Sequence, residues 1–206
     1  MAYSVNSSTD GCYEGTTCLI NKLDIRDEKQ LADVEADITF AKMSELDKKP
    51  IDGAFDFEHY KAIHRFLFDE LYDWAGEIRT VNISKKGTHF AAAEEIQRIA
   101  DSCFRRLKEN NYFQDQDFDD FVDSIVDFYC VTNMLHPFRE GNGRTQRIFI
   151  TQLIRLNGYN IKFSKIDKDE LMIATIQAAQ GIEDHLRDIF SEAIVSEEQS
   201  FGFSMN

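Results

Sequence analysis

The sequence contains only 2 proline and 10 glycine residues among its 206 positions, so few points interrupt regular backbone structure. It also contains no apolar run close to the ~20 residues that a membrane-spanning helix requires. The polar segment 1–11 has no apolar core of the kind found in a secretory signal. These absences favour a compact and mainly helical protein that stays in the cytoplasm, where it is made, unless another machinery exports it.

Basic residues are also scarce, since 23 lysines and arginines stand against 37 acidic residues, giving a formal net charge of −14. Such a surface repels nucleic-acid phosphates and anionic lipids, so we expect neither nucleic acid nor membranes as partners. A phosphate-binding site must therefore be a local basic exception. The 4 cysteines form no CxxC pair, which gives no support to a zinc ribbon or a thioredoxin-like site, and we expect reduced thiols.

Hydrophobic residues make up 43% of the chain and include 17 phenylalanines, enough for a buried core. The length suits one domain, and no internal repeat is visible. We predict a domain over 13–195, an N-terminal tail over 1–12 and a C-terminal tail over 196–206.

Apolar residues recur at helical spacing through most of this domain. Helices are predicted over 27–46, 56–74, 92–110, 118–135, 144–157, 169–179 and 183–195. The residues expected to face the core include Ala41, Leu71 and Leu156. Gly158 is expected to end the fifth of these helices as its C′ residue.

One segment instead alternates apolar and polar residues, which is the pattern of a half-buried strand. It consists of Ile78, Arg79, Thr80, Val81, Asn82 and Ile83. We predict a turn over 84–87 and a short return strand over 88–90. The resulting hairpin would have a free edge available to pair with a peptide. The alternative is a connecting loop with some strand character.

The segment 136–147, HPFREGNGRTQR, joins two of the strongest predicted helices. Pro137 stops the incoming helix, because the residue before a proline is pushed out of the α region. A new helix is predicted to start near Gly143, and the unpaired N–H groups of a helix N-terminus attract anions. Gly141 and Gly143 let the backbone approach a phosphate closely, and Asn142 between them adds a neutral donor.

The charged residues of this segment fit nucleotide chemistry. Arg144 and Arg147 share a helix face and can bind phosphate with paired donors. Glu140 alone would repel phosphate, but it becomes a ligand when Mg²⁺ lies between them. His136 is a suitable general base for a hydroxyl proton near neutral pH. Taken singly, a histidine near a proline is more often structural and a GxG segment is more often a turn, while Arg144 and Arg147 alone can be surface salt-bridge partners. Phe138 is most simply a core anchor.

The segment matches the Fic motif, HPFx(D/E)GNGRxxR, at every specified position. The chain resembles the Fic family beyond this motif. Residues 68–79 resemble the stretch that leads into the family's target-binding flap, and 13–23 resemble the N-terminus of its toxin-type members. The resemblance implies an all-α fold, a helical bundle with a small β-hairpin flap. It also implies transfer of AMP from Mg·ATP to a Tyr, Ser or Thr hydroxyl of a target protein.

The same resemblance implies roles for single residues. His136 would deprotonate the target hydroxyl, Glu140 would carry the metal, and 78–90 would align the target as an added strand. The nucleotide-binding residues would be Gly141, Asn142 and Gly143 around the α- and β-phosphates, with Arg144 and Arg147 on the outer phosphates. Gly143 distinguishes the chain from the related Doc-type kinases, which carry lysine at this position.

Many Fic proteins are inhibited by a helix bearing (S/T)xxxE(G/N), whose glutamate pairs with the second motif arginine. The sequence has no match to this pattern; the nearest segment, 10–15, begins with aspartate. This resembles the toxin-type class, in which a separate small antitoxin supplies the helix. We therefore predict that Arg147 is the docking point for a partner's glutamate.

Two other functions stay open. A Fic enzyme can move a different group, such as UMP, phosphate or phosphocholine, with the same base. The chain can also be a non-enzymatic helical binding module with a relic site, although intact His136, Glu140 and Arg147 argue against a relic. Gln177, Gln180 and Asp184 are candidates for the adenine pocket by their position relative to the family, and a polar helix surface explains them equally well.

Overall fold

The computed structural model describes residues 10–85 and 87–196. Within these residues the fold is a bundle of seven α-helices with two small two-stranded antiparallel sheets, the first of which is a hairpin. The helices are α1 (Glu28–Lys48), α2 (Phe57–Phe68), α3 (Ile96–Glu109), α4 (Phe118–Leu135), α5 (Asn142–Leu156), α6 (Lys168–Ala178) and α7 (Asp184–Ala193). The strands are β1 (Ser84–Lys85) with β2 (Thr88–His89), and β3 (Tyr159–Ile161) with β4 (Ile194–Ser196). The all-α class with a small hairpin is therefore confirmed.

Aspartates begin several of these helices. The side chains of Asp27, Asp56, Asp117 and Asp167 accept hydrogen bonds from main-chain N–H groups in the first turns of α1, α2, α4 and α6. A cap of this kind stabilises a helix by ~1 kcal/mol relative to alanine. Part of the acidic surplus in the sequence thus serves to set where helices start.

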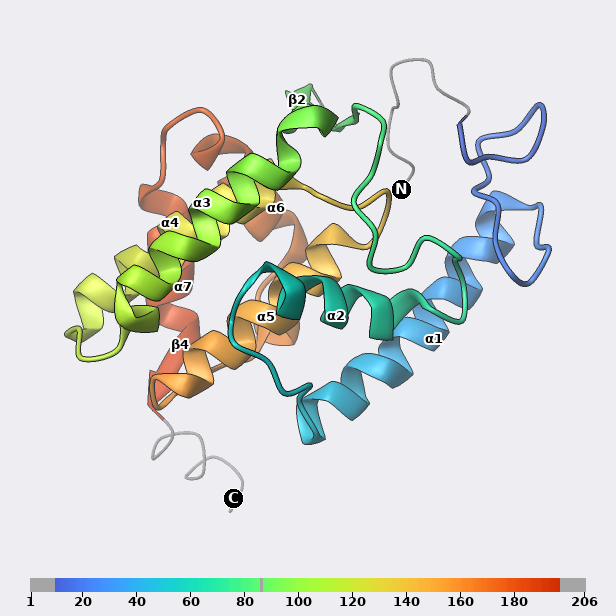
Figure 1. Cartoon of the computed structure of the whole chain (residues 1–206). Helices are drawn as coiled ribbons and strands as arrows, with labels where there is room; N and C mark the ends of the chain where they lie inside the picture. Colours follow the sequence, from blue (N-terminus) through green and yellow to red (C-terminus); the bar gives the residue numbers. More distant parts are fainter. Residues whose placement is uncertain (1–9, 86, 197–206) are drawn as a thin grey trace.

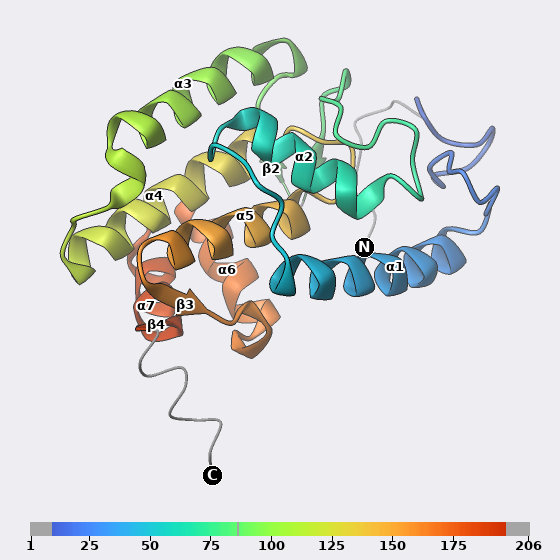
Figure 2. The same ribbon diagram turned by 60° about the horizontal axis from the view of Figure 1, so that its bottom comes forward.

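Helix α5 lies at the centre of the bundle. It packs against α1 and α2 on one side and against α4 on the other, and α3 and α7 pack in turn on α4 (Figures 1 and 2). The ring of Phe149 on α5 contacts those of Tyr60, Phe104 and Phe128, which come from α2, α3 and α4. The core therefore forms around α5 and fixes the start of this helix.

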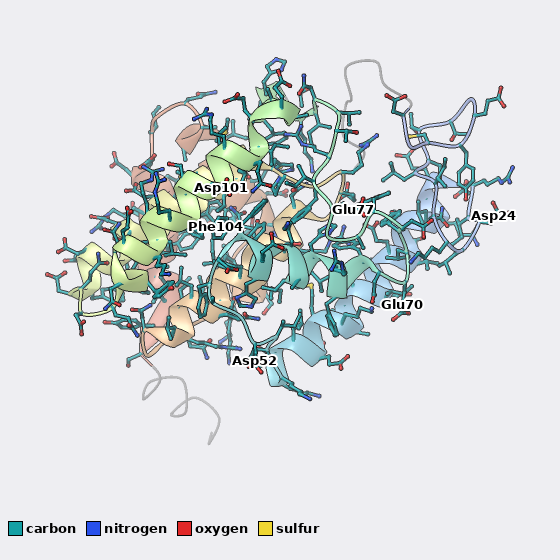
Figure 3. The ribbon with its side chains drawn as sticks, viewed as in Figure 1. Asp24, Asp52, Glu70, Glu77, Asp101 and Phe104 are labelled. Carbon is teal, nitrogen blue, oxygen red and sulfur yellow. The ribbon has the colours of Figure 1, made fainter. Side chains whose placement is uncertain are left out.

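Exposed charged residues and buried apolar residues lie on different faces of the same helix. On α3, Phe104 is buried in the core whereas Asp101, one turn earlier, is exposed (Figure 3). Asp24, Asp52 and Glu70, also labelled in Figure 3, are exposed as well. No helix among the described residues has the length and apolarity needed to cross a bilayer.

Several predicted boundaries were wrong. The helix predicted over 56–74 ends at Phe68, although Leu71 beyond it is buried as expected. Helix α5 begins two residues before its predicted start at 144, because Gly141 takes the N-cap position. Leu156, expected in the core, is 41% exposed, and Ala41 is also exposed. Gly158 follows α5 with a positive φ of 78°, as predicted for a C′ residue.

The predicted strand over 78–83 is absent from the structure, and the alternative of a connecting loop is the correct one. The main-chain N–H of Arg79 donates to the carbonyl of Pro137 instead of a partner strand. The hairpin forms later, with β1 at 84–85, where a turn was predicted, while β2 agrees with the predicted return strand. The second sheet, in which β3 pairs with β4 across the intervening α6 and α7, was not predicted.

The predicted tails lie mostly outside the described residues, which start at Asp10 and end at Ser196. Cys12, placed in the N-terminal tail, forms a β-bridge with Leu19, and Ser196 pairs with Tyr159. The domain boundaries at 13 and 195 stay a prediction.

Candidate active site

His136 lies at the C-cap of α4 in the left-handed region, with φ 42° and ψ 60°. This backbone costs a residue with a side chain ~1–2 kcal/mol, so surrounding contacts must hold it. Nδ1 of the ring lies 3.0 Å from the carbonyl oxygen of Asn133. A carbonyl only accepts hydrogen bonds, so Nδ1 carries the proton and the lone pair of the neutral ring is on Nε2. The ring stacks on Phe90, with centroids 3.7 Å apart.

The electrostatic environment keeps this ring neutral. Burial, together with the positive charges of Arg79 and Lys85, lowers the pKa of His136 to about 3, although the hydrogen bond with the Asn133 carbonyl opposes this shift. The residue is 7% exposed. His136 is therefore an unprotonated base throughout the physiological pH range.

Asn142 holds the loop between α4 and α5 in shape. Its Oδ1 accepts a hydrogen bond from the N–H of Phe138 at 2.8 Å, and its Nδ2 donates to the carbonyl of the same residue at 2.8 Å. Phe138 is fully buried, as predicted for a core anchor. Because both polar ends of the Asn142 side chain bind Phe138, the contribution of Asn142 to an anion site would come from its main-chain N–H.

His64 on α2 supports the loop between α4 and α5, and no motif in the sequence pointed to it. Its Nδ1 accepts from the N–H of Gly76 at 2.8 Å, and Nε2 therefore donates to the carbonyl of Glu140 at 3.0 Å. The ring stacks on Phe138, with centroids 3.8 Å apart. Burial lowers the pKa of His64 to about 3. A histidine in the middle of the predicted apolar face of α2 was the signal available in the sequence.

Gly141 is the N-cap of α5 and has a φ of 78°. A Cβ at this position would lie under 3.0 Å from the ring of Phe68, so a side chain has neither the backbone conformation nor the space that it needs. The main-chain N–H of Gly141 donates to Oε1 of Glu140 at 2.8 Å. The loop thus turns tightly into α5, whose first N–H groups point out of the helix start, where an anion can bind.

Arg147 lies beside the same helix start. A Cβ at Gly143 would meet its Nη1 at 3.1 Å, which places the guanidinium next to the backbone of Gly143. The structure therefore brings Gly143 and Arg147 together, as the predicted phosphate site requires.

Arg144 points to the other side, toward α1. Its Nη2 donates to the carboxylates of Glu35 and Glu140, and its Nη1 donates to Thr39 at 3.1 Å. The hydroxyl of Tyr72 donates to the second oxygen of Glu35. Glu35 is a buried acid that the sequence analysis missed, although its spacing from Leu31 and Thr39 places it on the buried side of α1. Arg144 thereby ties α1 to the start of α5.

Glu140 is the candidate metal ligand. Burial and the nearby Glu35 raise the pKa of its carboxyl group, whereas Gly141 and Arg144 favour the ionised form. The described residues contain no group of three or more acidic, histidine or cysteine side chains that could hold a metal ion. One carboxylate completed by substrate phosphates suits Mg²⁺, which commonly binds in this way.

The predicted flap residues divide by burial. Arg79 and Ile83 are buried, Thr80 and Asn82 are exposed, and the remaining two are half-buried. Oδ1 of Asn82 accepts from the N–H of Ala93 at 2.8 Å, which ties the start of the flap to the segment after it.

The candidates for the adenine pocket lie where α6 gives way to α7. Gln177 is half-buried, with Oε1 3.1 Å from Nδ1 of His185, whereas Gln180 and Asp184 are exposed. Their role stays a prediction.

Comparisons with known proteins identify relatives whose sequences align with most of the chain. The Fic/DOC family model matches residues 54–154. The protein adenylyltransferase VbhT of Bartonella schoenbuchensis is 36% identical over 169 residues, covering 82% of this chain and 35% of that protein. The chain therefore spans about a third of this relative. The probable protein adenylyltransferase Fic of Escherichia coli is 32% identical over 182 residues, covering 88% of this chain and 90% of that protein.

Solved structures share the fold. BepC, a VirB-translocated effector of Bartonella tribocorum with bound AMPPNP, aligns with a TM-score of 0.84 at 26% identity, over 91% of this chain and 97% of that one. The N-terminal Fic domain of a Bartonella quintana effector with bound ADP aligns with a TM-score of 0.86 at 27% identity, over 93% and 97%.

Proposed function

Because the chain belongs to the Fic/DOC family, we propose that it is a protein adenylyltransferase, which transfers AMP from ATP to a Tyr, Ser or Thr hydroxyl of another protein. The observation that carries the proposal is the tautomer of His136, which leaves a lone pair on Nε2 in the same short loop that leads into the N-terminus of α5. Since the donor is ATP, we also propose that the protein acts in the cytoplasm.

In the proposed step, the target hydroxyl oxygen attacks the α-phosphorus of ATP. A new oxygen–phosphorus bond forms, the bond from the α-phosphorus to the bridging oxygen breaks, and pyrophosphate leaves. The hydroxyl proton passes to Nε2 of His136. The negative charge of the bound triphosphate raises the pKa of His136 from its low value, which makes it a stronger base when the donor is present.

The triphosphate would be held at the α5 start by the main-chain N–H groups of Asn142 and Gly143, and by that of Gly141 once it leaves the Glu140 carboxylate to which it donates. Arg147 would bind the outer phosphates, and Arg144 would add positive charge from its place against Glu35. Glu140 would hold Mg²⁺, which when bound neutralises the charge of the leaving pyrophosphate. The segment 78–90 would align the target, with the short β1–β2 hairpin offering the edge for an added strand.

The test is incubation of bacterial lysate proteins with isotopically labelled ATP, UTP or CDP-choline, each in turn, followed by intact mass measurement of the labelled proteins. We expect the added mass of adenylate, and we expect His136→Ala to lower transfer by ~10²–10⁴-fold with ATP affinity preserved. An added mass of UMP, phosphate or phosphocholine identifies the related Fic chemistries instead. No label on any protein, from a chain that binds ATP, favours the helical binding module.

We further propose that inhibition comes in trans, from a small antitoxin whose glutamate docks on Arg147. Glu35 is a glutamate from outside the motif that reaches a motif arginine, but its carboxylate binds Arg144, the first of the two. The isolated chain should therefore be active, and Glu35→Gln should not raise its activity. A silent isolated chain that Glu35→Gln activates would place the inhibitor within the chain itself.

A further inference from the structure

Arg79 is a buried cation that bridges separate parts of the site. The residue is among the most buried of the charged residues, at 4% exposure. Nε donates to the carbonyl of His136 at 2.8 Å, Nη1 to that of Val81 at 2.6 Å, and Nη2 to that of Ala91 at 2.6 Å. Its main-chain N–H also donates to the carbonyl of Pro137 at 2.9 Å. Arg79 thus binds the carbonyls of His136 and Pro137, which begin the loop between α4 and α5. It also binds the two segments that flank the β1–β2 hairpin, at Val81 and Ala91.

The two flanks need such a bridge because their own pairing is short. β1 and β2 contain two residues each, and Val81 and Ala91 lie beyond them on opposite sides. An isolated hairpin of this size is marginal in water. The guanidinium joins these flanks where the ladder does not extend, and a hydrogen bond from the N–H of Ala91 to the carbonyl of Met134 adds a second tie to α4.

The three acceptors of the Arg79 side chain are carbonyl oxygens, not carboxylates. Burying a guanidinium without a carboxylate partner is costly, and the nearby charge of Arg139 is also positive. Burial lowers the pKa of Arg79 to about 10, so the group stays charged near neutral pH. A fork of fixed planar donors can serve three diverging carbonyls, whereas a lysine ammonium cannot span them in the same way.

We propose that Arg79 is a positioning residue that holds His136 and the flap in one frame, so that a target hydroxyl aligned by the flap meets Nε2. His136 has a left-handed backbone, and such conformations persist only where contacts over-determine them. Arg79 supplies two of those contacts at residues 136 and 137. This inference rests on the proposed function, because the alignment matters only if His136 receives the proton of the target.

The consequence is a split between donor binding and transfer. Arg79 binds the carbonyl side of His136, while the helix start that would hold ATP is fixed by Asn142, Gly141 and His64. Loss of Arg79 should therefore leave ATP affinity within ~2-fold. A displacement of about 1 Å at reacting groups lowers rates by ~10²-fold, which is the loss expected for transfer to protein.

The experiment compares Arg79→Met and Arg79→Lys with Arg105→Met, a matched change at an exposed arginine of α3. Three quantities are measured for each variant: ATP affinity by calorimetry, the rate of labelled AMP transfer to lysate proteins, and the thermal midpoint. A ¹H–¹³C spectrum of the histidine rings, titrated with acid, reports on His136 independently of activity. Arg79→Met should raise the titration midpoint of His136, because a facing positive charge is lost while Lys85 remains.

The proposal is supported if Arg79→Met loses transfer by ~10²-fold with ATP affinity preserved, Arg79→Lys recovers part of it, and Arg105→Met matches the wild type. It is overturned if transfer and the His136 signal are unchanged, or if transfer and ATP affinity fall together with the thermal midpoint. Should Arg79→Met not fold, Arg79→Lys decides by the same criteria. If the wild type transfers no AMP, the proposed function fails, and the His136 titration alone then decides whether Arg79 positions the ring.

Discussion

Replacing Gly141 with alanine should damage the fold and the proposed phosphate site through a steric conflict that the structure defines. The new Cβ would lie under 3.0 Å from Cε2 and Cζ of Phe68. Phe68 cannot move away easily, because its ring is fully buried, stacks near His64 and lies under the guanidinium of Arg144. The backbone of Gly141 also has a φ of 78°, which is unfavourable for alanine.

The magnitude follows from two contributions. The left-handed backbone costs alanine ~1–2 kcal/mol, and overpacking a filled core costs a further ~1–3 kcal/mol. The expected loss of unfolding free energy is therefore ~2–5 kcal/mol. Gly158→Ala is a matched control, since Gly158 has the same φ of 78° and a Cβ added there would meet no atom within 4 Å. It should lose only the backbone contribution.

The assay is urea unfolding of both variants, with thermal melting as a second measure. For a chain of this size each kcal/mol lowers the midpoint by ~2–4 °C. Gly141→Ala should also weaken ATP binding, which Gly158→Ala should leave unchanged. Equal losses of stability in the two variants would refute the steric argument, because the strain that they share would then explain both. A Phe68→Leu change added to Gly141→Ala should recover part of its loss.

The ion pair of Glu35 with Arg144 gives one further prediction, and the buried His64 and His136 give another. Glu35→Ala should lower the free energy of unfolding, measured in urea, by ~3–5 kcal/mol, because Arg144 keeps its charge but loses this partner. Glu35→Gln should lose less, and an unchanged urea midpoint for Glu35→Ala would contradict the prediction. Folded His64 and His136 have pKa values of about 3, below the unfolded value of ~6.5, so the unfolded chain takes up more protons as pH falls. Stability should therefore fall as pH drops below ~6.5, with a slope approaching ~2.7 kcal/mol per pH unit for the two residues, and His136→Ala should remove about half of that slope.

The loop from α4 to α5 could be predicted because its chemistry is local. Pro137, the two glycines and the arginines lie within one short segment, and their backbone consequences do not depend on distant residues. The end of α4 at Leu135 was predicted correctly for this reason. The role of each site residue in catalysis stays a prediction.

The loop structure of the segment 78–83 could not be decided from the sequence. Its apolar and polar residues alternate as in a strand, but the alternation has a different cause. Arg79 occupies a buried position as a cation, and its side chain binds main-chain carbonyls that a strand would offer to a neighbour. Periodicity reports burial but not the partner of a hydrogen bond. His64 and Glu35 were missed for the same reason, since each is a polar residue whose partner lies far along the chain.

His136, the proposed base, and the helix start that would hold the donor lie on one turn between two helices that pack on each other. The Asn142 side chain closes this turn on itself through Phe138. A hinge movement between α4 and α5 would therefore not easily separate the proton acceptor from the phosphates. Control of such an enzyme is most direct by obstruction, either by filling the turn or by keeping acceptor proteins from the flap.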